Sequence, residues 1–182
     1  MKRFIKLILI FLFIWFFAAS ITTAHSKKSQ EDALLKVAFI YKFTKFVKWP
    51  GNIKNSPLVL CTMGEDKLVD IFSNLANDLS STPKIQIQSI TDNSAVSNCQ
   101  VLYIASSERG RYRNIDSITR KKAVLTISEL SGFMQAGGII ELIHKDNRIG
   151  FDINLDAAHI NGLEISSRLL KLASKVKWDN KP

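Results

Sequence analysis

The amino-acid sequence predicts an α/β fold: a mainly parallel sheet with a C-terminal antiparallel hairpin and helices on both faces. Two observations lead to this class. Short continuous apolar runs, typical of buried strands, alternate with segments whose apolar residues have helical spacing. Near the C-terminus, residues 139–144 and 148–153 are two strand-like runs joined by a short polar turn, which predicts a β-hairpin.

Residues 1–24 have the layout of a secretory signal peptide. Three basic residues lie within the first six positions, residues 7–19 form an unbroken apolar run, and Ala24 suits a cleavage site. The apolar run is shorter than the roughly 20 residues of a membrane-spanning helix, although an uncleaved anchor is the alternative. We therefore predict an exported protein in which residues 25–182, 182 − 24 = 158 residues, form a single domain.

The first helix of this domain is predicted over residues 34–49. Ser29 and Asp32 match the pattern of a capping box one turn earlier, and Pro50 ends the helix because it disfavours the helical conformation of the residue before it. Apolar side chains spread over more than one face of the helix. Such a helix is usually buried or has a partner on its second side, and we interpret it as a core helix.

Strands and helices then alternate, as a mainly parallel sheet requires. The predicted elements are a strand over 58–63, a helix over 65–79, strands over 84–90 and 99–105, a helix over 109–119, a strand over 123–127, a short helix over 128–138, the hairpin, and helices over 155–161 and 166–176.

The chain is basic, with a formal net charge of +9, of which three charges belong to the leader, so the mature part carries 9 − 3 = +6. An exported protein rarely meets nucleic acid. The densest basic cluster, between residues 109 and 122, contains only Tyr112 as an aromatic residue, whereas single-strand binding surfaces repeat them. We therefore predict no nucleic-acid partner. The charge favours acidic protein surfaces, anionic lipid or an anionic small molecule.

The motifs of the common cofactor sites and catalytic sites are missing. The turn after the strand over 58–63 carries one glycine and two acids, instead of the G-x-G-x-x-G of a dinucleotide site or the end of a P-loop. No serine lies in a G-x-S-x-G elbow. Glu141 and His144 are three positions apart on a predicted strand and so point to opposite faces. We predict no cofactor, no metal site and no enzymatic activity.

Cys61 and Cys99 are the two cysteines of the chain. An even number of cysteines in an oxidising compartment suggests a disulfide, and closing the loop of 99 − 61 + 1 = 39 residues would add about 4 kcal/mol of stability. However, Cys61 lies late in its predicted strand and Cys99 just before another. Parallel neighbours would place them toward opposite ends of the sheet, so two separate buried thiols are the alternative.

Four segments of the sequence together resemble the YfiR family of exported proteins. They are AFIYKFTKFVKWP, LCTMG, CQVLYIAS, and the tail from GGIIELIHKDNRIGFDINLD to LLKLASKV. The resemblance covers nearly the whole mature chain in matching order. It implies a Rossmann-like fold without the Rossmann cofactor, and it implies that Cys61 and Cys99 are bonded, since both match cysteine positions of the family. A second cysteine pair of some members is replaced here by Ile139, Ile140 and Leu142, which puts redox control through that pair in doubt.

The resemblance also implies a function. Members similar to this chain are periplasmic proteins that repress an inner-membrane diguanylate cyclase by binding its periplasmic sensor region, which lowers cyclic di-GMP and biofilm formation. In the best-known systems an outer-membrane lipoprotein sequesters the repressor, and dimers occur. We therefore expect a cyclase, a lipoprotein and a second copy of the chain as partners.

The hairpin is the predicted contact surface for the cyclase. We select Ile140, Phe151, Ile153 and Asn154, because Phe151 and Ile153 share one strand face and would supply an apolar anchor. The same alternation also describes core residues, and a mutant such as Phe151→Asp separates the two interpretations.

A second function remains open: a periplasmic sensor that binds a small anionic or aromatic ligand at the strand-end crevice. Lys45, Lys48 and Trp49 are the residues predicted to form part of that site.

Overall fold

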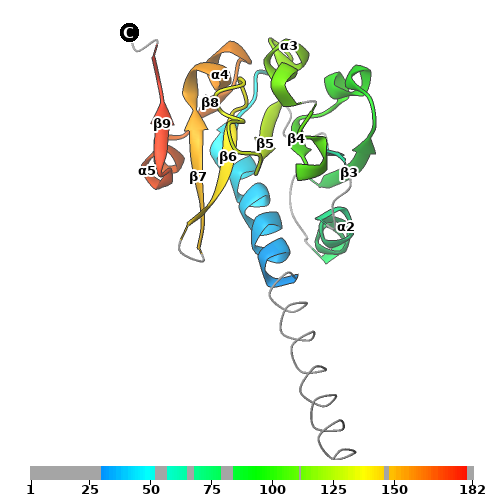
Figure 1. The fold of residues 1–182 in the computed structure, drawn as a ribbon. Coiled ribbons are helices and arrows are strands. Elements are labelled where there is room, and N and C mark those ends of the chain that lie inside the picture. Colours follow the sequence, from blue (N-terminus) through cyan, green and yellow to red (C-terminus); the bar gives the residue numbers. More distant parts are fainter. Residues whose placement is uncertain are drawn as a thin grey trace, which may run out of the picture.

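The computed structural model describes residues 30–51, 57–64, 68–78, 84–110, 112–145 and 148–179. Within these residues, a seven-stranded sheet forms the centre of the molecule (Figure 1). Its strands are β2 (Leu58–Met63), β3 (Ile85–Ile90), β4 (Val101–Ile104), β5 (Leu125–Ser128), β6 (Ile140–Lys145), β7 (Arg148–Asn154) and β9 (Lys175–Lys177).

The strands lie in the order β3-β2-β4-β5-β6-β7-β9. The pairs from β3 to β6 are parallel, β7 is antiparallel to β6, and β9 is parallel to β7. The predicted fold class, a mainly parallel sheet with a C-terminal hairpin, is therefore confirmed. A second, two-stranded sheet pairs β1 (Val47–Lys48) with β8 (Glu164–Ile165).

Both faces of the main sheet are covered, because its central strands are apolar on both sides. Along β4, Val101 and Tyr103 belong to one hydrophobic cluster, while Leu102 and Ile104 belong to a second cluster on the other face. The first cluster takes side chains from the helix over residues 30–46 and from α2 (Leu68–Asp78), α4 (Leu155–Ile160) and α5 (Ser167–Leu172). The second takes them from η1 (Asn93–Asn98), a 3-10 helix, and from α3 (Ile115–Thr119).

The predicted closing helix over 166–176 is wrong in its second half. Helix α5 ends at Leu172, Ala173 has extended backbone angles (φ −66°, ψ 141°), and the next residues form strand β9 beside β7. Val176 has an apolar side chain in helical register, but it lies opposite Ile153 in the sheet instead. Consequently β9, and not the hairpin, forms this edge of the sheet, and β3 forms the opposite edge (Figure 1).

Three other predicted helices differ in extent. The first is helical over 30–46, and the chain then forms β1, because Val47 pairs with Ile165. The segment predicted as a helix over 109–119 contains η3 (Tyr112–Asn114) before α3, and η2 (Ser106–Glu108) precedes it. The segment predicted as a short helix over 128–138 is mostly turns.

The predicted signal peptide lies outside the described residues. None of the described helices combines the length and the apolar character that crossing a membrane requires.

Candidate functional site

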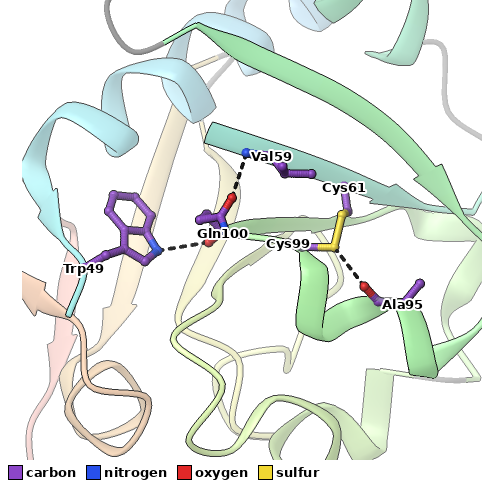
Figure 2. Close-up of a disulfide and its surroundings, with 6 residues drawn as sticks. All are labelled: Trp49, Val59, Cys61, Ala95, Cys99 and Gln100. Atoms are coloured by element: carbon purple, nitrogen blue, oxygen red, sulfur yellow. Dashed lines mark hydrogen bonds between the residues drawn. A yellow bond between two sulfur atoms is a disulfide. The ribbon is translucent and has the colours of Figure 1, made fainter. Parts of the chain in front are cut away.

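Cys61 and Cys99 form a disulfide on the face of the sheet that carries the second hydrophobic cluster (Figure 2). Their Cα atoms are 5.8 Å apart, inside the range that a disulfide needs. The geometric objection based on parallel strands is therefore wrong. Cys99 follows η1, which packs on the same face of the sheet as Cys61. The chain therefore approaches β4 over that face and brings Cys99 close to Cys61, instead of lying within the sheet.

The residue after Cys99 explains the position of Trp49. Gln100 makes two hydrogen bonds with Val59: its N–H donates to the Val59 carbonyl (2.9 Å) and its Oε1 accepts from the Val59 N–H (2.8 Å). The indole Nε1–H of Trp49 donates to the Gln100 carbonyl at 3.2 Å (Figure 2). Trp49 is only 7% exposed. This hydrogen bond fastens the end of β1 to the main sheet. In this conformation the indole ring is buried and offers little surface to the predicted ligand.

Lys45 and Lys48, the other two predicted ligand residues, line one shallow hollow of about 260 Å³ at the β1–β8 sheet, together with Glu164 and Ser166 among others. Lys48 Nζ and Glu164 Oε2 form a salt bridge of 3.0 Å, with both side chains at least 70% exposed. Such an exposed pair contributes little stability. The hollow adjoins the strand connected to Trp49, and Trp49 contacts the residue before β4. It therefore lies at the amino ends of the parallel strands.

Ligands usually bind at the carboxyl ends of the strands in such sheets, and between β2 and β4 this end is packed against the η2 turn. Gly64 follows β2 with a φ of +93°, a conformation that favours glycine. A Cβ at this position would lie 2.5 Å from Ser107 Oγ and 2.7 Å from Glu108 Cγ. The η2 turn thus packs directly on the Gly64 backbone.

The structure buries all four predicted partner contacts. Ile140 and Ile153 are 0% exposed, and Phe151 and Asn154 are 4% exposed. Ile140 and Ile153 lie opposite each other in the hairpin ladder within the first hydrophobic cluster. This burial agrees with the alternative interpretation of the alternation, that these are core residues, and contact of the hairpin with the cyclase stays a prediction.

Two of these residues have clear structural roles. The ring of Phe151 packs edge-on against Phe43 at a centroid distance of 4.9 Å, so the helix over 30–46 covers this strand. Asn154 caps α4: its Oδ1 accepts from the Ala157 N–H at 3.0 Å. Its Nδ2 donates to the Met134 carbonyl at 3.0 Å, which holds the turn segment before β6.

A charged cluster around Glu129 was not predicted. Its carboxylate lies 2.7 Å from Lys36 Nζ and 3.5 Å from His144 Nε2, and accepts a hydrogen bond of 3.3 Å from the Tyr103 hydroxyl. The side chains of Lys36 and Glu129 are only 16% and 17% exposed. Because the Lys36 ammonium neutralises the carboxylate, the cluster fastens the first helix to the end of β5. Its members are far apart in sequence, and no motif connects them.

A row of charges crosses the opposite face of the hairpin. Glu141, Asp152 and Lys175 occupy directly paired positions on β6, β7 and β9, and such residues share a face. The Glu141 carboxylate accepts hydrogen bonds from the N–H groups of Gly132 and Met134. Burial, and secondarily the charge of Glu141, raise the pKa of Asp152, while Lys175 acts in the opposite direction.

A few large apolar side chains are exposed among the described residues. Leu172 on α5 is 67% exposed, and Ile160 on α4 and Trp178 after β9 are each 38% exposed. The Trp178 ring stands edge-on to His159, 6.3 Å between centroids, so α4 and the end of β9 form one surface. Leu34 and Leu35, on the first helix, are 50% and 45% exposed.

These features define a class of protein: a Rossmann-like α/β domain whose second hydrophobic cluster contains a disulfide. Within the part of the chain that the structure describes, no three His, Cys, Asp or Glu side chains are grouped to hold a metal ion.

A comparison with protein families matches residues 33–174 to the family described as YfiR/HmsC-like. Because this match covers most of the chain, the protein belongs to the YfiR/HmsC-like family. A search of curated proteins gave no match.

Two solved structures share the fold. A conserved domain protein from Vibrio cholerae O1 biovar El Tor is 12% identical with a TM-score of 0.60, and the ABC domain in complex with L-Trp from Streptococcus pneumonia is 11% identical with a TM-score of 0.55. Each match covers 80% of this chain and 60% of the other chain. At this identity, the similarity concerns the α/β fold alone.

Proposed function

We propose that this protein is an exported regulator that represses an inner-membrane diguanylate cyclase by binding the cyclase's periplasmic sensor region. Repression would lower cyclic di-GMP and biofilm formation. The observation that carries the proposal is membership of the YfiR/HmsC-like family over residues 33–174, since this family is regulatory rather than catalytic. The Cys61–Cys99 disulfide supports an oxidising compartment such as the periplasm.

The cyclase contact needs a surface other than the buried hairpin residues. We place it where α4 meets the end of β9, because Ile160 and Trp178 are exposed there and aromatic side chains are frequent anchors of interfaces. An outer-membrane lipoprotein that sequesters the regulator would compete for the same surface.

Cellular cyclic di-GMP tests the proposal. Deleting the gene in the organism that encodes it is expected to raise cyclic di-GMP, and the full chain should reverse the rise. A chain without residues 1–24 should fail, because it would not reach the periplasm. Trp178→Ala should also fail, whereas Leu172→Ala, a matched loss of exposed apolar surface on α5, should restore repression. Unchanged cyclic di-GMP after deletion contradicts the function; equal repression by Trp178→Ala contradicts only the surface.

A small-ligand sensor is the second candidate, and one observation favours it: Lys45 and Lys48 line the same hollow. An anionic ligand would compete with Glu164 for Lys48, which the exposed salt bridge permits. Thermal shift against a panel of anionic metabolites, with Lys48→Ala as the control, tests this function. A ligand-dependent rise in melting temperature that the control loses supports it, and no shift across the panel counts against it.

A further inference from the structure

The two edge strands of the main sheet, β3 and β9, differ in length and in charge (Figure 1). Strand β9 has three residues, of which two are lysines. Strand β3 has six residues, with the sequence IQIQSI, and none of them is charged or a proline. Short length, charge and proline are common means by which proteins prevent another strand from adding to an edge. The β3 edge has none of these three.

One hydrogen bond shows which backbone groups of β3 face outward. The Lys84 carbonyl accepts from the Leu58 N–H at 2.8 Å, so the backbone groups of Lys84 point toward β2. Because neighbouring residues of a strand point these groups to opposite sides, the outward N–H and C=O groups belong to Ile85, Ile87 and Ser89. In the part of the chain that the structure describes, no strand pairs with β3 on that side.

The side chains of β3 define the surface that an added strand meets. Ile85 and Ile87 lie on the face that α2 covers, and both are only partly buried in the first hydrophobic cluster. Gln86 and Gln88 point to the other face and are exposed. A strand beside β3 therefore has an apolar environment on one face and a polar environment on the other.

We propose that the β3 edge is a docking site for an extended segment of a partner protein, which adds to the main sheet as a new edge strand. The occupant follows from the chemistry of the edge, because another extended backbone satisfies a row of N–H and C=O groups at strand spacing. The side chains of this segment alternate, with apolar ones beside Ile85 and Ile87 and polar ones beside the two glutamines. Lys84, exposed just before β3, favours an acidic residue at that end of the segment.

This site is separate from the surface proposed for the cyclase. Trp178 follows β9, and β9 and β3 are the opposite edges of the seven-stranded sheet. The inference therefore does not depend on the proposed function, and its tests require only the exported, mature protein.

Amide hydrogen exchange followed by NMR is the first measurement, because it shows whether the edge is open. In the free protein, the N–H groups of Ile85, Ile87 and Ser89 should exchange at least about tenfold faster than those of Gln86 and Gln88, which face β2. Equal protection of the two sets overturns the proposal, since the outward groups would then already have partners.

Two fluorescent hexapeptides serve as binding probes. Each alternates valine and threonine over five residues and carries one glutamate, either as the first or as the last residue. Fluorescence anisotropy should show saturable binding, with one probe tighter than the other, because only one direction of the added strand brings the glutamate beside Lys84. Lys84→Glu should remove this preference. Failure of both probes to bind overturns the proposal.

N-methylation of the tighter probe tests strand addition itself, because it removes the N–H donors from one edge of the peptide. With its valines beside the isoleucines, a probe that prefers glutamate first lies parallel to β3 and directs its threonine N–H groups toward β3. A probe that prefers glutamate last lies antiparallel and directs its valine N–H groups there. Methyl groups on the facing set should weaken binding at least about tenfold, and those on the other set should have little effect. Equal effects of the two sets overturn the proposal.

A matched pair of protein variants locates the site. Ile87→Pro removes one outward N–H and keeps the bonds to β2, since an edge strand tolerates proline at such a position. Ile87→Val keeps the N–H with a side chain of similar size. The proline variant should bind the probe at least about tenfold more weakly, and the valine variant should bind it as the wild type does.

Circular dichroism melts establish that both variants are folded, and Ser89→Pro, which removes the next outward N–H, replaces Ile87→Pro where that variant does not fold. Wild-type affinity in a folded proline variant overturns the proposal. Sedimentation velocity without peptide distinguishes the other occupant of such an edge, a second copy of the chain. Self-association that the proline variant abolishes assigns the edge to that second copy and also overturns the proposal.

Discussion

The β6–β7 hairpin and the helix over residues 30–46 are both rich in apolar side chains, but their surroundings differ. The hairpin is enclosed: the helix covers one of its faces through Phe43 and Phe151, and β9 pairs along its outer edge. The helix is enclosed on one side only, since Leu34 and Leu35 remain about half exposed. An apolar stretch therefore becomes core only when other parts of the chain return to cover it. Apolar content alone does not decide burial.

The largest expected effect comes from placing a charge inside the hairpin. Phe151→Asp removes a core ring and buries a carboxylate, which should cost about 4 kcal/mol or more of the free energy of unfolding. This is a large share of the stability of a typical domain. Urea unfolding followed by circular dichroism measures the loss. A variant of native stability that no longer binds the cyclase would show instead that the hairpin is a partner surface.

A smaller effect is expected on the other face of the same strand. The raised pKa of Asp152 means that the folded protein binds this proton more tightly than the unfolded chain does. Between the unfolded pKa, near 3.9, and the higher folded pKa, the free energy of unfolding falls as the pH rises, because the unfolded chain loses this proton more readily. Above the folded pKa the loss of stability is complete. Asp152→Asn should raise the melting temperature slightly at pH 7, and the gain should disappear near pH 3.5. A gain that persists at acidic pH would exclude ionisation as its cause.

The smallest effect is expected at the exposed Leu35 of the helix over residues 30–46. Leu35→Lys should change the free energy of unfolding by no more than about 0.5 kcal/mol, because the side chain is exposed. Ile40→Ala, on the buried side of the same helix, should cost about 2–5 kcal/mol. Urea midpoints of the two variants at low protein concentration provide the test. Equal losses would mean that both sides of the helix are core.

Much of the fold was predictable because local pattern and final environment agree. The continuous apolar runs of β2 and β4 are buried on both faces, and the hairpin has the expected pairing, with strands one residue from the predicted bounds. Strand β9 was missed because its extended form depends on pairing with β7, more than twenty positions earlier in the chain. The spacing of apolar residues within LLKLASKV does not indicate this pairing with β7.

The candidate site was less predictable than the fold. The disulfide followed from the cysteine positions of the family, and Lys45 and Lys48 do lie together. Trp49, however, depends on a single hydrogen bond to the Gln100 carbonyl, and the hairpin residues depend on the helix that packs over them. The Glu129 cluster joins side chains from four separate segments. Only three-dimensional folding brings these groups together.

Strand β9 also determines what a shortened chain would do. It is three residues long, carries two lysines, and forms the border of the sheet beside the seven-residue β7. Short, charged border strands discourage other chains from adding to a sheet. A premature stop codon or a proteolytic cut before Lys175 would leave the longer β7 as the border, with its backbone open to other molecules. We therefore expect β9 to protect this edge of the sheet against the addition of another chain.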